Sequence, residues 1–167
     1  NLMDLINPMH IGTKKSKIDI SFENKTKLIS EKISKNLAKG DIIFLFGNIG
    51  VGKTTFIKYL INYLQSEVNF KKTEIPSPTF NIMNEYDVKK FIIRHFDLYR
   101  LKKFSDLKNI GLYENLDETV TLIEWPELLK DKINDRIDLI FDYEENYNKR
   151  NISIITGKRK IIINDNK

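Results

Sequence analysis

The strongest chemical signal lies in one short segment, residues 47–54 (GNIGVGKT), which matches the pattern G-x-x-x-x-G-K-[ST] in full. In such a loop the glycines let the backbone wrap closely around phosphate groups, toward which backbone amides and a helix N-terminus direct positive potential. Lys53 is suited to reach the outer phosphates, and the hydroxyl of Thr54 is suited to ligate magnesium. The segment is therefore predicted to be a P-loop that binds ATP and Mg2+.

Two carboxylates are placed to complete such a site, which needs an acidic group near the metal and a group that positions the attacking water or acceptor. Asp97 ends the strand-like run 90–97, and Glu124 ends the more apolar run 120–124. Both residues would lie at the C-terminal ends of strands, where both could face the phosphates. We therefore predict that Asp97 and Glu124 belong to the site.

Three neighbouring residues carry weaker signals. His95 is a lone histidine in a strand and is interpreted as structural. Trp125, the only tryptophan, is equally suited to stack on a base or a partner and to pack in a partly buried position. Arg100 is a secondary candidate for stabilising charge on the phosphates.

The P-loop needs a strand before it and a helix after it. Residues 41–46 (DIIFLF) form a short apolar run typical of a strand buried on both faces of a parallel sheet. Residues 54–64 place apolar side chains on one helical stripe. The spacing further predicts a helix at 24–37, short helical pieces within 105–117, and strands at 17–21, 80–86, 90–97, 119–125, 136–143, 151–156 and 159–163.

These elements predict an α/β fold, a P-loop NTPase-like three-layer sandwich with a mixed, partly parallel central sheet. The sheet is expected to be parallel near the P-loop and antiparallel elsewhere, with a hairpin turn near residues 87–89 and antiparallel strands after residue 136. No internal repeat or long linker interrupts the chain, so a single P-loop ATPase domain is expected over residues 1–167.

Composition limits the class of protein. The 167 residues are 41% hydrophobic, enough for one core, and no stretch approaches the roughly 18 consecutive apolar residues of a membrane helix. The chain has no cysteine and only two histidines, so a zinc site is not expected. Any metal is expected to be a hard cation held by oxygen. The net charge of +5 is interpreted as a solvated, lysine-rich surface. We expect a cytoplasmic protein without membrane contact.

Three further segments follow the P-loop in order: residues 77–80 (SPTF), 95–101 (HFDLYRL) and 123–127 (IEWPE). Together with the P-loop, this set resembles the bacterial TsaE (YjeE) family, the P-loop ATPases of tRNA threonylcarbamoyladenosine biosynthesis, from about residue 23 to residue 150. The resemblance implies a small ATPase that works with the TsaD and TsaB pair. That pair would modify the adenosine beside the anticodon, and tRNA would be met only through the complex.

The resemblance also implies roles for individual residues. Catalytic roles fall to Lys53, Asp97, Glu124 and Thr79, the last as a sensor of the γ-phosphate. The magnesium ion would be held by Thr54 and Glu124 and supported by Asp97. The residues implied to bind the nucleotide are Gly50, Val51, Gly52, Lys53, Thr54, Thr55, Trp125 and, less directly, Glu23 and Arg150. One position departs from the family pattern, because Asn48 stands where an acidic residue usually follows the first P-loop glycine.

Other functions share the same motif. A small-molecule kinase is the main alternative, although it needs an acceptor pocket and an arginine-bearing lid, of which residues 100–103 (RLKK) are the only trace. A guanine-nucleotide switch is disfavoured because the chain has neither N-K-x-D nor D-x-x-G. A nucleotide-binding assembly module without turnover stays open, since binding and hydrolysis use the same residues.

Overall fold

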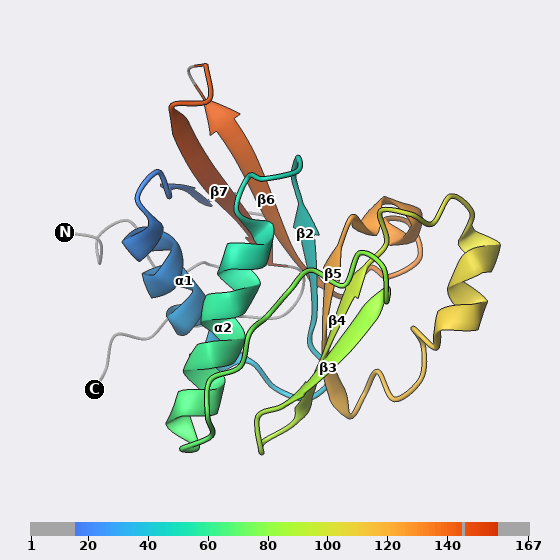
Figure 1. The fold of residues 1–167 in the computed structure, drawn as a ribbon. Coiled ribbons are helices and arrows are strands. Elements are labelled where there is room, and N and C mark those ends of the chain that lie inside the picture. Colours follow the sequence, from blue (N-terminus) through green and yellow to red (C-terminus); the bar gives the residue numbers. More distant parts are fainter. Residues whose placement is uncertain (1–15, 145, 157–167) are drawn as a thin grey trace.

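The computed structural model describes residues 16–144 and 146–156, which form a seven-stranded sheet with helices on one face and short 3-10 segments on the other (Figure 1). The strands are β1 (Ser16–Asp19), β2 (Ile42–Phe46), β3 (Met83–Asp87), β4 (Ile92–Asp97), β5 (Thr119–Glu124), β6 (Ile137–Glu144) and β7 (Lys149–Thr156). The helices are α1 (Glu23–Asn36) and α2 (Lys53–Glu67), and the 3-10 segments are η1 (Phe104–Ile110) and η2 (Pro126–Leu129).

The strand order is β1-β7-β6-β2-β5-β4-β3. The four strands β6, β2, β5 and β4 are parallel to one another, whereas β3, β7 and β1 pair antiparallel with their neighbours. This arrangement confirms the predicted mixed sheet, parallel around the strand that leads into the P-loop. Because β2 lies between two parallel partners and is buried on both faces, every position in it is apolar.

The two α-helices cover one face of the sheet and bury their apolar stripes against it (Figure 1). From α1 the stripe includes Ile29 and Ile33, and from α2 it includes Ile57 and Leu60. The opposite face carries a second, smaller cluster in which Phe44 and Phe96 of the sheet pack beneath η1 and η2. These layers confirm the predicted three-layer α/β sandwich.

Several boundaries differ from the prediction. The strand expected over 80–86 begins only at Met83, because residues 79–82 form a turn with Ile82 in the left-handed region. The helical pieces expected within 105–117 reduce to η1 followed by turns. The hairpin predicted near 87–89 is present between β3 and β4. Of the strands after residue 136, β6 pairs antiparallel with β7 as predicted, but its other neighbour, β2, is parallel to it. The strand predicted at 159–163 lies outside the described residues.

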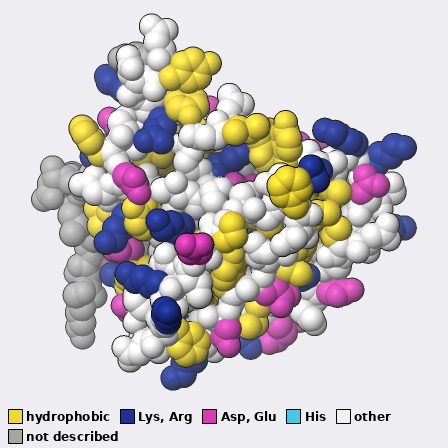
Figure 2. All heavy atoms as spheres, viewed as in Figure 1, with side chains coloured by type: hydrophobic (Ala, Val, Ile, Leu, Met, Phe, Trp, Pro, Cys, Tyr) yellow, Lys and Arg dark blue, Asp and Glu magenta, His cyan; other side chains and the backbone are white. Residues whose placement is uncertain are grey.

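The surface follows the mild basic balance of the sequence. In Figure 2, Lys and Arg side chains gather over α1 and the adjoining part of α2, with acidic side chains interspersed among them. Within residues 16–144 and 146–156, no helix has both the length and the apolar character needed to cross a bilayer.

Gly47 fixes the path of the chain where β2 ends and the P-loop begins. Its φ is +146°, and a Cβ atom at this position would lie 2.8 Å from the carbonyl oxygen of Phe141 on β6. The same Cβ would lie 2.8 Å from Cγ1 of Val51, so it would be squeezed from two sides. The absence of a side chain therefore lets the loop turn tightly against the neighbouring parallel strand.

We predict that Gly47→Ala lowers the free energy of unfolding by about 2 kcal/mol or more, because it combines backbone strain with overpacking against fixed backbone. Gly50→Ala is the matched control. Gly50 has φ +77°, but the nearest atom to its added Cβ is the Tyr143 hydroxyl at 3.8 Å, so only the backbone cost of about 1 kcal/mol applies. Urea denaturation measures both, and equal losses would contradict the close approach at Gly47.

Candidate functional site

The carboxyl ends of three parallel strands, β2, β5 and β4, meet the beginning of α2 at one edge of the sheet. Strand pairing sets Leu45 opposite Glu124 and Glu124 opposite Asp97, so these positions lie level with one another. A pocket of about 340 Å³ opens there. It is lined by Ile49, Gly50, Gly52, Lys53, Thr54, Thr55, Ser77, Thr79, Asp97, Tyr99, Glu124, Trp125 and Arg150.

The N-terminus of α2 supplies positive potential to this pocket. Its N-cap is Gly52, which has no side chain to cap the helix, and no acidic residue occurs in the first turn. The first amides of a helix have no acceptors within the helix, and the aligned peptide dipoles place partial positive charge at that end. The start of α2 is therefore built to receive an anion.

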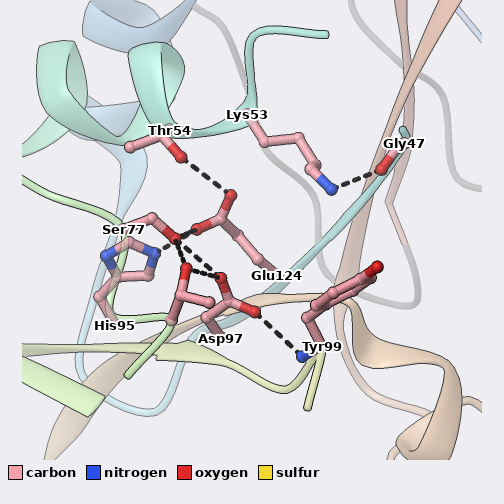
Figure 3. A network of polar contacts seen from close by, with 9 residues as sticks. Gly47, Lys53, Thr54, Ser77, His95, Asp97, Tyr99 and Glu124 are labelled. Carbon is pink, nitrogen blue, oxygen red and sulfur yellow. Dashed lines mark hydrogen bonds and ion pairs between the residues drawn. The ribbon is translucent and has the colours of Figure 1, made fainter. Parts of the chain in front are cut away.

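Lys53 brings a full positive charge to the same place. Only 4% of its surface is exposed, and its ammonium donates a hydrogen bond to the Gly47 carbonyl (Figure 3). The ammonium also lies 3.9 Å from the centre of the Trp125 ring. Burial lowers the pKa of Lys53, while Glu124 and Asp97 oppose that shift because they stabilise its charged form. A bound phosphate would favour the charged ammonium in the same way.

Trp125 follows directly after β5 and has a left-handed backbone, with φ of 55°. This turn brings the indole beside Lys53, and the Tyr99 ring packs against it with centroids 4.8 Å apart. Trp125 therefore forms part of the pocket wall, in contact with the P-loop lysine.

Glu124 lies at the centre of the polar contacts and is 2% exposed. Its Oε1 accepts a hydrogen bond from the Thr54 hydroxyl at 3.1 Å, and its Oε2 lies 2.8 Å from Nε2 of His95 (Figure 3). A hydroxyl and a carboxylate oxygen this close together are of the type that Mg2+ prefers as ligands.

Ser77 connects the two carboxylates. Its hydroxyl donates to Oδ2 of Asp97 at 2.7 Å and lies 3.4 Å from Oε2 of Glu124. The Thr79 hydroxyl reaches the same Asp97 oxygen at 3.3 Å, and the backbone amide of Tyr99 donates to Oδ1 at 3.0 Å. The segment before β3 is thus tied to both acidic residues of the site.

Most of the residues predicted for nucleotide and metal binding line this single pocket. They are Gly50, Gly52, Lys53, Thr54, Thr55, Thr79, Asp97, Glu124, Trp125 and Arg150. Val51 does not line it, because its side chain is buried in the core. Glu23 also lies outside the lining, at the start of α1, where its carboxylate accepts a hydrogen bond from Tyr59.

Arg100 and Asn48, which the sequence singled out, do not line this pocket. The guanidinium of Arg100 lies 4.4 Å from the centre of the exposed Phe80 ring. Asn48 lines a neighbouring hollow that also involves Tyr143. Sequence patterns alone assign no role to Ser77, although its place two residues before Thr79 in the SPTF segment is a signal that can identify it.

The described part of the chain contains no group of three or more His, Cys, Asp or Glu side chains arranged to enclose a metal ion. This is compatible with Mg2+, which usually keeps several waters and is bound by one or two carboxylates together with substrate phosphates. The oxygens of Thr54 and Glu124 fit that mode of binding.

Comparison with known proteins identifies the family. The family model described as "Threonylcarbamoyl adenosine biosynthesis protein TsaE" matches residues 20–152. The chain belongs to the TsaE family. A TsaE protein from Rickettsia conorii is 36% identical over 142 residues, covering 84% of this chain and 78% of that protein. Another from Aquifex aeolicus is 35% identical over 127 residues, covering 76% and 87%.

The fold agrees with a solved structure. The crystal structure of YdiB from Bacillus subtilis superimposes with a TM-score of 0.68 at 24% identity and covers 89% of each chain. At this identity the likeness supports the fold alone. The YdiB structure matches the architecture predicted from the order of strand, loop and helix. The family model confirms the resemblance to TsaE proteins that the SPTF, HFDLYRL and IEWPE segments carry.

We predict that Ser77→Ala lowers the free energy of unfolding by about 1–3 kcal/mol in the presence of EDTA, because Asp97 loses its closest donor. Thr79→Val is the matched control, since its hydroxyl makes longer contacts, at 3.3 Å, with Asp97 and Ser77. Its loss is expected to be the smaller of the two. Urea denaturation of both variants measures the difference, and a larger loss for Thr79→Val would contradict the central place of Ser77.

Proposed function

We propose that this TsaE-family chain is the ATPase subunit required for threonylcarbamoyladenosine modification of the tRNA adenosine beside the anticodon, acting in complex with TsaD and TsaB. The observation that carries the proposal is the meeting of Thr54 of the P-loop with Glu124 of β5, 3.1 Å apart, in a pocket that also holds Lys53. Relatives from several bacteria carry the name tRNA threonylcarbamoyladenosine biosynthesis protein TsaE, which supports the assignment to this pathway.

The residues present fit ATP and magnesium. The P-loop and the start of α2 offer backbone amides to phosphates, and the buried ammonium of Lys53 offers a charge that a phosphate would stabilise. Thr54 and Glu124 would hold the metal, with Asp97 in support through Ser77. Magnesium, when bound, neutralises charge that develops on the phosphates and fixes their orientation.

The chain's own groups would position water and sense the phosphate. Thr79 and Ser77 both contact Asp97. A shift of Asp97 on phosphate binding or release would therefore move the segment before β3. Arg150 of β7 lines the pocket, where its charge would face the phosphates. These contacts support the proposal that the rate of ATP hydrolysis depends on the position of the segment 77–80.

The mouth of the pocket suits a protein partner. Ile49 at the tip of the P-loop is 71% exposed, and Phe80, next to Thr79, is 79% exposed. Apolar side chains beside a catalytic pocket favour coverage by another protein, which would exclude water from the phosphates. Docking of TsaD and TsaB at this mouth would make hydrolysis dependent on the complex.

Mg2+ is expected to raise the affinity for ADP. We predict that Glu124→Ala lowers this Mg2+-dependent gain in affinity by roughly tenfold or more, because one of the two proposed metal ligands is lost. In EDTA the affinity should stay the same or rise, since a negative charge near the phosphates is gone. A fluorescent ADP analogue titrated with and without Mg2+ measures both values.

Glu127→Ala is the control for that measurement. Glu127 is an exposed carboxylate of η2 that acts electrostatically on Lys53 but does not line the pocket. It should leave the Mg2+-dependent gain intact. Equal effects of Glu124→Ala with and without Mg2+ would argue against metal ligation by Glu124.

The proposed function is tested by phosphate release from ATP, measured for the chain alone, with TsaD and TsaB, and with both proteins plus tRNA. We expect very slow hydrolysis alone and clear stimulation by the two partners. Lys53→Ala should abolish the stimulated rate, because it removes the charge that meets the phosphates. Partner-independent transfer of phosphate to a small acceptor would instead identify a kinase.

A further inference from the structure

We propose that His95 is a positioning residue for the metal site: its imidazole holds one oxygen of Glu124 so that the other oxygen faces Thr54. The inference rests on the proposed function, because Glu124 is taken to bind the magnesium that accompanies the nucleotide. It gives a role to a histidine whose sequence context indicated only a structural one.

Strand register places His95 under the site. On β4 the side chains of Ile93, His95 and Asp97 share one face, and the corresponding face of β5 carries Leu122 and Glu124. His95 pairs with Leu122, and Glu124 lies two residues further on, level with Asp97. The imidazole is therefore one step deeper in the core than the two carboxylates, on the side covered by α2.

The two oxygens of Glu124 have separate partners. Oε2 lies 2.8 Å from Nε2 of His95 and 3.4 Å from the Ser77 hydroxyl, whereas Oε1 faces the Thr54 hydroxyl at 3.1 Å. Figure 3 shows the Glu124 carboxylate between Thr54 on one side and His95 with Ser77 on the other. Contact with His95 fixes the rotation of the carboxylate, so that Oε1 is the oxygen left for a cation beside Thr54.

Burial assigns the proton of the imidazole to Nε2. His95 is 0% exposed, and Nδ1 has no hydrogen-bond partner within the described residues. A proton on Nδ1 would be a buried donor without an acceptor, whereas a proton on Nε2 meets the Glu124 carboxylate. His95 therefore donates from Nε2. A donor that orients a ligating carboxylate is the usual means by which a protein holds a metal ligand in place.

The first test measures the affinity of a fluorescent ADP analogue in Mg2+ and in EDTA. In His95→Leu the Mg2+-dependent gain should fall by about 10- to 100-fold, the range seen when such supporting groups are removed, while the affinity in EDTA is kept. His95→Gln should recover much of the gain, because its side-chain amide can place an N–H near the position of Nε2.

Ile93→Ala is the control for a purely structural effect. Ile93 is 0% exposed, two residues earlier on the same face of β4, and is not among the residues that contact Glu124 or line the pocket. Its removal should cost stability but leave the Mg2+-dependent gain unchanged. If His95→Leu does not fold, His95→Asn takes its place, because its amide is one methylene shorter and does not reach the position of Nε2.

The second test uses the unmodified chain. Two-bond ¹⁵N–¹H spectra of the imidazoles report which ring nitrogen carries the proton, and a His10→Gln variant assigns the signals of the only other histidine. We expect the Nε2–H form for His95. An Nδ1–H form would overturn the proposal, as would an unchanged Mg2+-dependent gain in His95→Leu or His95→Asn, or an equal loss in Ile93→Ala.

These outcomes separate the inference from the proposed function. If the unmodified chain gains affinity with Mg2+ and the His95 variants gain equally, only the role of His95 is refuted. If the unmodified chain binds nucleotide without any gain from Mg2+, both proposals are overturned, since no metal is then held by Glu124.

Discussion

Two buried carboxylates occupy paired positions of β4 and β5, and the polar contacts of the site converge on them. Asp97 is directly opposite Glu124 in the parallel register, and both are at most 5% exposed. Like charges on neighbouring side chains with so little exposed surface are costly unless donors and cations surround them. Several hydroxyl, imidazole and ammonium groups that the fold brings to this edge of the sheet compensate part of that cost.

The compensating groups come from three separate parts of the chain: the segment before β3, the start of α2 and strand β4. Ser77 and Thr79 donate from the segment before β3, and Thr54 donates from the first turn of α2. His95 contributes from within the core, and the charge of Lys53 acts on both carboxylates. The same arrangement that stabilises the acidic pair thus links the P-loop to the segment 77–80, so that the loops around the pocket are held through the carboxylates.

Local sequence patterns were sufficient to predict the elements around the P-loop. The apolar run before Gly47 and the helical stripe after Thr54 have the periods of a buried strand and an amphipathic helix, and both are present. The pairing of β6 was harder to predict, because alternation along a strand does not specify which neighbour it meets. The contact of His95 with Glu124 depends on the register between β4 and β5, of which a single histidine in a sequence carries no sign. The contacts of Ser77 depend on how the segment before β3 folds back onto the ends of these strands, which local patterns do not specify.

The position of Lys53 couples the binding of the nucleotide to the binding of the metal ion in the proposed site. Its ammonium is held by the Gly47 carbonyl and the Trp125 ring, and its charge also offsets those of Glu124 and Asp97. A phosphate bound by Lys53, as proposed, would share this charge and bring further negative charge near the carboxylates. A divalent cation held by Thr54 and Glu124, as proposed, would restore the balance. Because such coupling is reciprocal, the metal should strengthen nucleotide binding by the same factor by which the nucleotide strengthens metal binding.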